Sequence, residues 1–362
     1  MQEEFDNTAE KKENLDNQEN IIEKNPTNKK TTTFNILLIV AIFIVLLIYM
    51  LKVDGIDNII KILKTVDYKW VFLGGLCLLV HWSCEGLNLH IPIKRMYKDQ
   101  KIFDSVKIAM IGQLFNNITP FSTGGQPMQA YELNKMGRRV SDSFSAMAMK
   151  FAITQTALVT TTIVIVLTEF GFVRELMGDY IWVAIVGVIL NIIAIIAVIL
   201  AGIKKEIITF IANPIINILA KIHVIKDKEK AKEKMDKSIS NFRNQFVLMK
   251  SEKKMVLKMF IIAVIQSLAY YSITYMIYRA FGNYGINFFQ IVPVQAFLLL
   301  IMTFIPTPGS GLGAEGGFYL LFNSIFKGDT INMSILFWRI YTFYLPILVG
   351  LIFLIPKRQN RD

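Results

Sequence analysis

The chain has few of the residues that metal and redox sites need, with two cysteines and three histidines among 362 residues. Cys77 and Cys84 lie seven residues apart on one expected helix. That spacing puts their Cα atoms roughly 10 Å apart, which is too far for a disulfide. The sequence also has no CxxC pair and no Cys/His spacing typical of a structural metal. We therefore expect two small apolar side chains, no metal and no cofactor, and the redox compartment stays undecided.

Motifs of several enzyme classes are missing as well. The sequence has no GxxxxGK[ST] loop and no HExxH motif, so ATP-driven transport would require a separate subunit. Gly309, Ser310 and Gly311 form GSG rather than the GxSxG turn of a serine nucleophile, and His81 and His90 lie in another part of the chain. We expect no catalytic residue.

Long apolar runs dominate the sequence, in which hydrophobic residues make up 53% and the mean hydropathy is +0.45. Phe34 to Leu51 is a run of 18 residues with Asn35 as its polar side chain, close to the ~20 residues that cross a membrane. Five further runs follow: Trp70 to Ile91, Ser143 to Thr168, Tyr180 to Ile203, Val256 to Phe281 and Ile331 to Ile355. The composition predicts an all-α polytopic membrane protein with six transmembrane helices.

The two ends of the chain are polar. Residues 1–33 are rich in Asn, Lys, Glu and Thr and carry only isolated apolar side chains, so we expect a disordered cytoplasmic tail. The leader is long, is acidic as well as basic and precedes no small-residue cleavage site, so the first span is expected to stay as an anchor. The membrane domain is expected over 34–355, with a cytoplasmic tail over 356–362.

Basic residues in the short loops predict that both termini are cytoplasmic. Lys94 to Lys107 holds five Lys or Arg, whereas Glu169 to Asp179 holds only Arg174. Lys204 to Lys254 contains thirteen Lys or Arg and six acidic residues. We interpret 204–255 as a basic cytoplasmic linker with one or two short amphipathic helices attracted to anionic lipid. The exception is Lys52 to Lys69, whose four lysines would face outside.

Two Pro/Gly-rich breaks interrupt apolar sequence, NNITPFSTGGQPMQAY at Asn116 to Tyr131 and TFIPTPGSGLGAEGGFY at Thr303 to Tyr319. Non-helical backbone at membrane depth is tolerated only where it is buried in protein or lines a cavity. The charge pattern predicts two re-entrant helical hairpins, the first entering and leaving from inside and the second from outside. Two packing kinks in ordinary helices are the alternative.

The order span, hairpin, span occurs twice, over about 69–168 and 256–355. Pro120 lies 51 residues after Lys69, and Pro306 lies 50 residues after Val256. The two units have opposite predicted topology, which is typical of the inverted repeats of secondary transporters. We expect an inverted repeat whose half-helix ends meet near the midplane.

Three motifs carry a family resemblance: the first break with its following YELNKMG (Tyr131 to Gly137), PTPGSGLGAEGG (Pro306 to Gly317) and WRIYTFYLP (Trp338 to Pro346). Together they resemble the membrane region of the lysylphosphatidylglycerol synthase family, also called flippase-like proteins. The resemblance extends from Phe34 to Ile355. It implies a flippase region, often followed in the family by a soluble aminoacyltransferase domain, which we do not expect here.

Polar residues in and beside the breaks are the candidates for substrate binding, since intramembrane ionisable groups usually face a cavity or a partner. Arg339 and Glu315 match the family's motif positions and are expected to pair, either to bind a lipid phosphate or as a structural ion pair. The first break offers donors and glycines that permit close approach, although any one residue could instead cap a half-helix. The candidate path residues are Asn116, Asn117, Pro120, Ser122, Thr123, Gly124, Gly125, Gln126, Pro127, Glu132, Lys135, Pro306, Pro308, Gly309, Gly311, Gly313, Glu315, Arg339 and Tyr341.

Glu85 and His81 form a further candidate pair. They lie one helical turn apart, a spacing that can hold a proton or a metal. The sequence favours a plainer interpretation, in which Glu85 lies near the cytoplasmic end and contacts the loop lysines.

The sequence thus predicts a flippase-like transporter of a phospholipid, in a bacterial cell membrane. The expected partners are the bilayer and an anionic or aminoacylated phospholipid, with a separate synthase or a second copy of the chain as candidate protein partners and no nucleic acid. The alternatives are a phosphatidylglycerol lysyltransferase and a small-solute or ion transporter built on the same repeats.

Overall fold

Helices form all the regular structure in the part of the chain that the computed structural model describes, which is residues 60, 64–178, 181–210, 213–214, 228–302, 313–326 and 330–354. All of these lie in one unit, Ile60–Asp362. The expected tail 1–33, the expected first span Phe34 to Leu51 and the expected tail 356–362 lie outside the described residues.

Five helical segments are long and apolar enough to cross a membrane, in agreement with the five apolar runs predicted after Leu51. They are α4 (Tyr68–Met96), α7 (Val140–Thr168), α9 (Ile181–Ile203), α12 (Lys253–Ala280) and the segment Ile331–Leu354, which contains α15 and α16. The chain is therefore a multi-pass membrane protein.

The helix α4 begins at a side-chain cap. The carboxylate of Asp67 accepts a hydrogen bond of 3.0 Å from the backbone N–H of Lys69, which satisfies one of the free donors of the first turn. At the other end the helix continues past Pro92 to Met96, with Lys94 and Arg95 in its last turn, where cations are favoured by the helix dipole.

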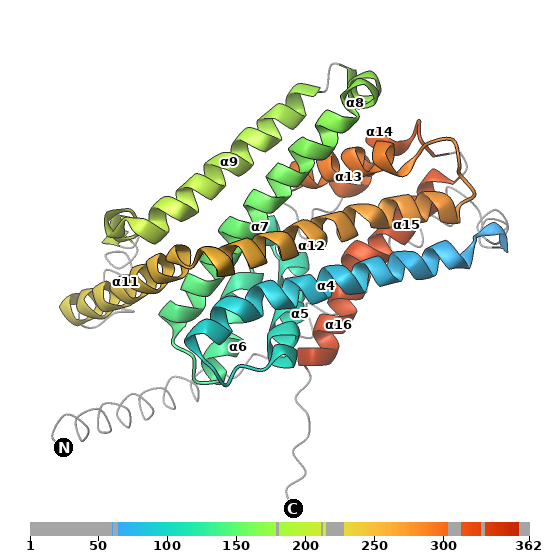
Figure 1. Cartoon of the computed structure of the whole chain (residues 1–362). Helices are drawn as coiled ribbons and strands as arrows, with labels where there is room; N and C mark the ends of the chain where they lie inside the picture. Colours follow the sequence, from blue (N-terminus) through green and yellow to red (C-terminus); the bar gives the residue numbers. More distant parts are fainter. Residues whose placement is uncertain are drawn as a thin grey trace, which may run out of the picture. The chain divides into compact units, whose positions relative to one another are not determined.

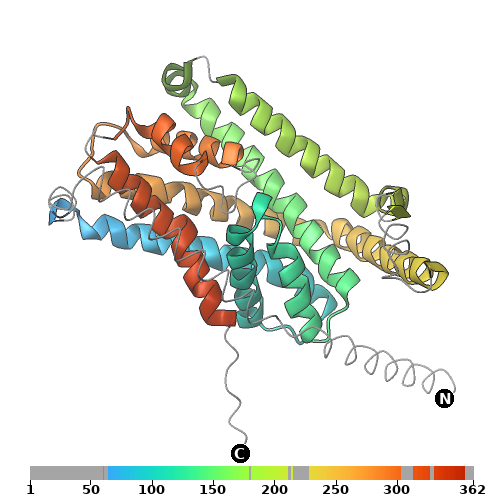
Figure 2. The same ribbon diagram turned by 180° about the vertical axis from the view of Figure 1, so that it is seen from behind.

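The helices α4 and α12 lie side by side and antiparallel along their lengths (Figures 1 and 2). The N–H of Asp67 donates to the carbonyl of Ala280 at one end of the pair (2.9 Å), and Arg95 forms an ion pair with Glu252 at the other. Between these ends, Nδ1 of His81 lies 3.2 Å from the carbonyl of Gln266. The first spans of the two expected repeats therefore pack directly on each other.

The first break separates two short helices that pack together, α5 (Ile102–Ile118) and α6 (Gly125–Lys135). At 1.5 Å per residue they are about 25 Å and about 16 Å long, so α6 alone is far too short to span a ~30 Å hydrocarbon core. A single 3-10 turn, Pro120–Ser122, joins them. Phe121 and Ser122 have φ values of 54° and 53°, a left-handed conformation that is costly for residues with a Cβ.

A cluster of polar contacts holds the two outer ends of this hairpin together. Arg138 donates to the carboxylate of Asp99 (2.7 Å), which lowers the pKa of Asp99. The hydroxyl of Tyr97 accepts from the N–H of Arg139 (2.9 Å) and donates to Asp142 (2.7 Å). Because residues before α5 contact residues after α6, both ends of the hairpin lie on one side of the bundle. Its placement in a bilayer remains a prediction.

The second break has the same order of elements. The helix α13 (Phe288–Met302) precedes it and packs on α14 (Gly313–Phe322), which follows it. Aromatic contacts bind both outer ends to the end of α12: Phe288 meets Tyr275 at a ring separation of 5.2 Å, and Phe326 meets Tyr278 at 5.4 Å. Residues 303–312 lie outside the described residues, and with them Pro306, Pro308, Gly309 and Gly311.

The last spanning segment changes its winding at its centre. The helix α15 (Ile331–Arg339) passes through a π-helical turn, Ile340–Tyr344, into α16 (Leu345–Leu354). Pro346 has no N–H to donate to the carbonyl of Thr342, which favours a wider turn there. The π-helical turn follows Arg339 directly, so the regular α-helical winding ends at one of the candidate residues.

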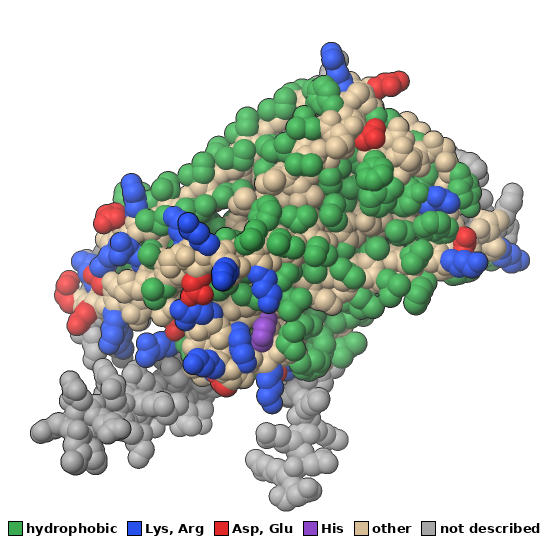
Figure 3. All heavy atoms as spheres, in the orientation of Figure 1, with side chains coloured by type: hydrophobic (Ala, Val, Ile, Leu, Met, Phe, Trp, Pro, Cys, Tyr) green, Lys and Arg blue, Asp and Glu red, His purple; other side chains and the backbone are tan. Residues whose placement is uncertain are grey.

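Within the basic linker, one helix of 24 residues is described, α11 (Lys228–Ser251), rather than short helices alone. It packs on α7 and α9, where Arg243 donates to the carbonyl of Ile203 (2.7 Å) and Phe246 lies over Gly202. Figure 3 shows Lys and Arg side chains gathered at the end of the bundle where α11 lies, whereas hydrophobic side chains cover most of its middle. This distribution is the one expected for a membrane-embedded surface with a basic end.

Candidate functional site

The first break is organised by two side chains that cap α6. The amide oxygen of Asn116 accepts from the N–H of Gly125 (2.9 Å), and the hydroxyl oxygen of Thr119 accepts from the N–H of Gly124 (2.8 Å). A Cβ on Gly125 would collide with the side chain of Asn116, so the glycine is needed for this close approach. Of the two roles that the sequence left open for Asn116, capping is therefore the one that the structure supports.

The amide of the neighbouring residue, Asn117, is placed differently. Its Nδ2 atom is buried and has no hydrogen-bond partner in the described part of the chain. A buried amide donor normally has a partner, so an unpaired one beside a break is a candidate contact for a bound acceptor. The other candidates of the break, Ser122, Thr123, Gln126 and Pro127, are exposed at its tip, and the backbone of Pro120 opens the 3-10 turn.

Near the outer end of α6, Glu132 and Lys135 form an ion pair of 2.9 Å, three residues apart. The ammonium of Lys135 also lies 4.3 Å from the ring centre of Tyr131. Both interactions are local to α6. They stabilise the returning helix and do not join it to the break itself.

Arg339 and Glu315 form the ion pair that the sequence predicts, with Nε of Arg339 donating to Oε1 of Glu315 at 2.7 Å. Glu315 lies in the first turn of α14, and Arg339 is the last residue of α15. An anion at a helix N-terminus is favoured by the helix dipole, whereas Arg339 lies near the middle of the continuous spanning segment Ile331–Leu354. The Arg339 side chain is 3% exposed, whereas that of Glu315 is 24% exposed.

Aromatic rings surround the guanidinium of Arg339. Its Cζ atom lies 5.2 Å from the ring centre of Trp338 and 5.4 Å from that of Phe343. Such rings attract a cation through their faces and keep water away from it. Gly313, another candidate, is the first residue of α14.

Tyr341 has a structural contact. Its hydroxyl donates to the backbone carbonyl of Val71 on α4 (2.6 Å), and its ring packs over Gly74. The residue thereby fastens the π-helical turn to α4. Further along, Gly350 of α16 packs so closely on Leu114 of α5 that a Cβ would come within 2.5 Å of the Leu114 Cβ. The segment that carries Arg339 is thus packed against the first hairpin.

A second buried ion pair, which the sequence interpretation missed, joins Glu85 of α4 to Lys150 of α7. The other carboxylate oxygen of Glu85 accepts from Nε2 of Gln266 on α12 (2.7 Å), and the side-chain oxygen of Gln266 accepts from Nδ2 of Asn88 (3.2 Å). We call these four residues the α4–α7–α12 cluster. All four are buried.

The expectation that Glu85 contacts the loop lysines is therefore wrong. Glu85 lies 11 residues before Met96, about 16 Å along the helix, and Lys150 lies about 15 Å into α7. Both residues are thus deep in their spans. The available signal was Lys150 itself, a lysine seven residues into the predicted span Ser143 to Thr168, since such residues almost always face a partner.

Chemically, the two breaks and the buried ion pairs offer hydrogen-bond donors and one buried guanidinium. In the ranges that the structure describes, no group of three or more His, Cys, Asp or Glu side chains is arranged as a metal site. The arrangement is suited to holding an anion or a polar headgroup by charge and hydrogen bonds.

Comparison with known proteins assigns the chain to a family. The family model of the lysylphosphatidylglycerol synthase TM region matches residues 36–350. No curated protein matches the sequence. The family match covers four of the described spans completely, the fifth as far as Gly350, both breaks and the α4–α7–α12 cluster. The chain therefore belongs to the family of lysylphosphatidylglycerol synthase transmembrane regions.

Proposed function

We propose that this membrane protein moves a phospholipid between the two leaflets, with the Arg339–Glu315 pair and the first break on the path of its headgroup. The observation that carries the proposal is the position of Arg339. A buried guanidinium at the end of α15, paired with a carboxylate that is still 24% exposed, is a phosphate site held closed by an internal anion.

The mechanism begins with an exchange of anions. A lipid phosphate that reaches the pair displaces the Glu315 carboxylate from Arg339, and both anions stay beside the N-terminus of α14. The Nδ2 donor of Asn117, which has no partner among the described residues, is available to the headgroup in the first break. The acyl chains stay in the hydrocarbon while the headgroup passes.

An inverted repeat provides a physical mechanism by which the lipid moves from one leaflet to the other. In both halves a long helix is followed by a broken pair of short helices and then by another long helix. We infer that the halves are related by an inverted repeat, and that rocking one against the other about the α4–α12 contact exposes the path to alternate leaflets.

A small-solute or ion transporter is the second candidate. The α4–α7–α12 cluster favours it, because a buried carboxylate and lysine beside His81 resemble the ionisable groups of proton-coupled carriers. The name of the family also raises a third activity, synthesis of lysylphosphatidylglycerol, which would require an aminoacyltransferase site.

One experiment separates these activities. The purified chain is reconstituted in liposomes that contain tail-labelled phosphatidylglycerol, lysylphosphatidylglycerol or phosphatidylcholine, and an impermeant quencher reports the label that reaches the outer leaflet. We expect faster exchange of at least one of these lipids than in protein-free liposomes, and loss of the increase in Arg339→Gln. Equal rates with and without protein for all three lipids would refute the proposal. Lysylated phosphatidylglycerol in lipid extracts of expressing cells, absent from cells with an empty vector, would support the synthase activity instead.

A further inference from the structure

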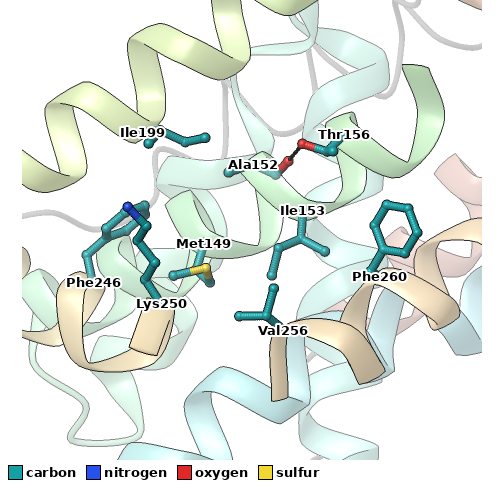
Figure 4. Close-up of a pocket in the computed structure, with 9 residues that line it drawn as sticks. All are labelled: Met149, Ala152, Ile153, Thr156, Ile199, Phe246, Lys250, Val256 and Phe260. Carbon is teal, nitrogen blue, oxygen red and sulfur yellow. Dashed lines mark hydrogen bonds between the residues drawn. The ribbon is translucent and has the colours of Figure 1, made fainter. Parts of the chain in front are cut away.

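A cavity of about 340 Å³ lies where α7, α9, α11 and α12 meet (Figure 4). Its walls are Met149, Ala152, Ile153 and Thr156 of α7, Ile199 of α9, Phe246 and Lys250 of α11, and Val256 and Phe260 of α12. This volume is within the range of about 300–1,000 Å³ for small-molecule sites. None of these residues belongs to the two breaks, to the Arg339–Glu315 pair or to the α4–α7–α12 cluster.

The walls offer almost no polar contact to an occupant. Thr156 is the polar uncharged residue among them, and its hydroxyl donates to the carbonyl of Ala152 within α7 (2.7 Å), as the dashed line in Figure 4 marks. The remaining wall residues other than Lys250 are aliphatic, aromatic or Met. The cavity therefore suits a hydrocarbon chain and not a polar solute.

Lys250 brings positive charge to the cavity. It is exposed, and it forms no ion pair with any residue in the described ranges. Lys253 and Lys254 follow at the start of α12, both exposed, while the nearby Glu252 is already paired with Arg95. The excess of positive charge beside the cavity is complementary to an anionic group.

The depth of the cavity also fits a lipid. Lys250 lies in the last turn of α11, and α12 begins three residues later, so the charge lies at the basic end of the bundle. Phe260 lies seven residues into α12, about 10 Å along the helix from Lys253. The cavity thus extends from the level of a headgroup into the level of acyl chains.

From these observations we infer that the cavity is a binding site for an anionic phospholipid of the bilayer, with an acyl chain against Ile153 and Phe260 and its phosphate at Lys250. This lipid stays bound and is not the transported one. It fills the space between α11, α12 and α7 and so stabilises the contact between the basic linker and the spanning helices. The inference goes beyond the proposed function and does not depend on it.

The test is photo-crosslinking of the full chain in nanodiscs that contain phosphatidylglycerol or phosphatidylcholine with a diazirine in the acyl chain. We expect labelling of the peptides around Phe246 and Phe260, at least fivefold stronger with phosphatidylglycerol. Lys250→Gln is expected to lower that preference about fivefold, as one lysine near an anionic surface contributes on the order of that factor. Ala152→Leu, which narrows the cavity by three carbon atoms, is expected to lower labelling there with both lipids.

Lys237→Gln is the matched control, since it removes the same charge from an exposed position on α11 outside the cavity. Equal labelling with the two lipids would mean ordinary contact with surrounding lipid and would overturn the inference. If Lys237→Gln lowered the preference for phosphatidylglycerol as much as Lys250→Gln, the preference would come from the overall charge of the protein, and the inference would also be overturned. Absence of labelling in the unmodified chain would show that the cavity holds no lipid. Melting temperatures of all variants in the same nanodiscs check that each is folded.

Discussion

The two buried ion pairs of this protein differ in what surrounds them. In the Glu85–Lys150 pair both side chains are about equally buried, with 10% of each exposed, and Gln266, which also accepts from Asn88, extends the contact to a third helix. In the Arg339–Glu315 pair the cation is 3% exposed and the anion 24%; Glu315 lies in the first turn of α14, and Arg339 lies directly before the π-helical turn of the last span. With Gln266, the first pair joins the middles of three long helices, whereas the second joins the first turn of α14, beside the second break, to the last span. We infer that the first is mainly structural and that the second is available to a substrate.

The largest expected effect is the loss of stability when the Glu85–Lys150 pair is broken. Lys150→Met leaves the Glu85 carboxylate buried without its cation, so we expect the free energy of unfolding to fall by about 3–5 kcal/mol. The double variant Glu85→Gln, Lys150→Met removes both charges and is expected to recover most of this loss. Thermal unfolding in detergent measures both. Equal destabilisation by the single and the double variant would contradict a structural role for the pair.

For the Arg339–Glu315 pair we expect the larger effect on transport. Arg339→Gln and Glu315→Gln are each expected to lower the initial rate of lipid exchange in liposomes at least tenfold, which corresponds to about 1.4 kcal/mol. Their melting temperatures should change less than that of Lys150→Met. The charge-exchanged double variant Glu315→Arg, Arg339→Glu can form an ion pair, but its guanidinium lies at position 315 and not at position 339. Recovery of transport in this variant would show that the pair is structural after all.

Smaller effects are expected at two neighbouring residues of the first break, Asn116 and Asn117, which differ in their hydrogen bonds. Asn116→Ala removes a cap of α6 and is expected to lower stability by about 1 kcal/mol. Asn117→Ala removes a donor with no partner in the described residues, so it is expected to leave stability almost unchanged and to slow transport. Melting temperatures and lipid exchange rates of the two variants, measured side by side, check this prediction. If one variant had both the larger loss of stability and the larger loss of transport, the prediction would be wrong.

The smallest effect concerns the contacts that close the first hairpin. Because Arg138 lowers the pKa of Asp99, the folded state holds this carboxylate ionised to lower pH than the unfolded chain does. The contribution of Asp99 to stability is therefore present above its ordinary pKa of about 3.9 and is lost as the pH falls through the lowered value. Melting curves of the parent and of Asp99→Asn should differ slightly at pH 7 and 5 and approach each other as the pH falls below the ordinary pKa of Asp99. Because Asp99 is exposed, high salt should reduce the difference.

Much of the fold can be predicted from the order of residues. Apolar runs of about 20 residues place the five described spans, since a helix must satisfy its own backbone and face hydrocarbon. The Pro/Gly cluster at Asn116 to Tyr131 marks the division between α5 and α6. The pairing of Arg339 with Glu315 also follows from sequence, because both are ionisable residues in motifs that resemble one family and each needs a partner at membrane depth.

The partner of Glu85 could not be predicted in the same way. Glu85 and Lys150 are 65 residues apart, and the loop lysines are nearer in sequence. Which cation meets the carboxylate depends on how α7 packs across α4, and no residue pattern within either helix specifies this. The same holds for the cavity beside Lys250, whose walls come from four helices spread over the chain from Val140 to Ala280.

Local sequence thus determines where this chain crosses the membrane, where its helices break and which polar residues lie at depth, because these properties depend on a residue and its near neighbours. Only the tertiary structure decides that the ends of the first hairpin meet through Arg138 and Asp99, that Asn116 is a cap while Asn117 is not, and that Glu85 bonds Lys150 and Gln266. These contacts depend on distances of a few ångströms between helices, and such distances are set by close packing of the whole bundle.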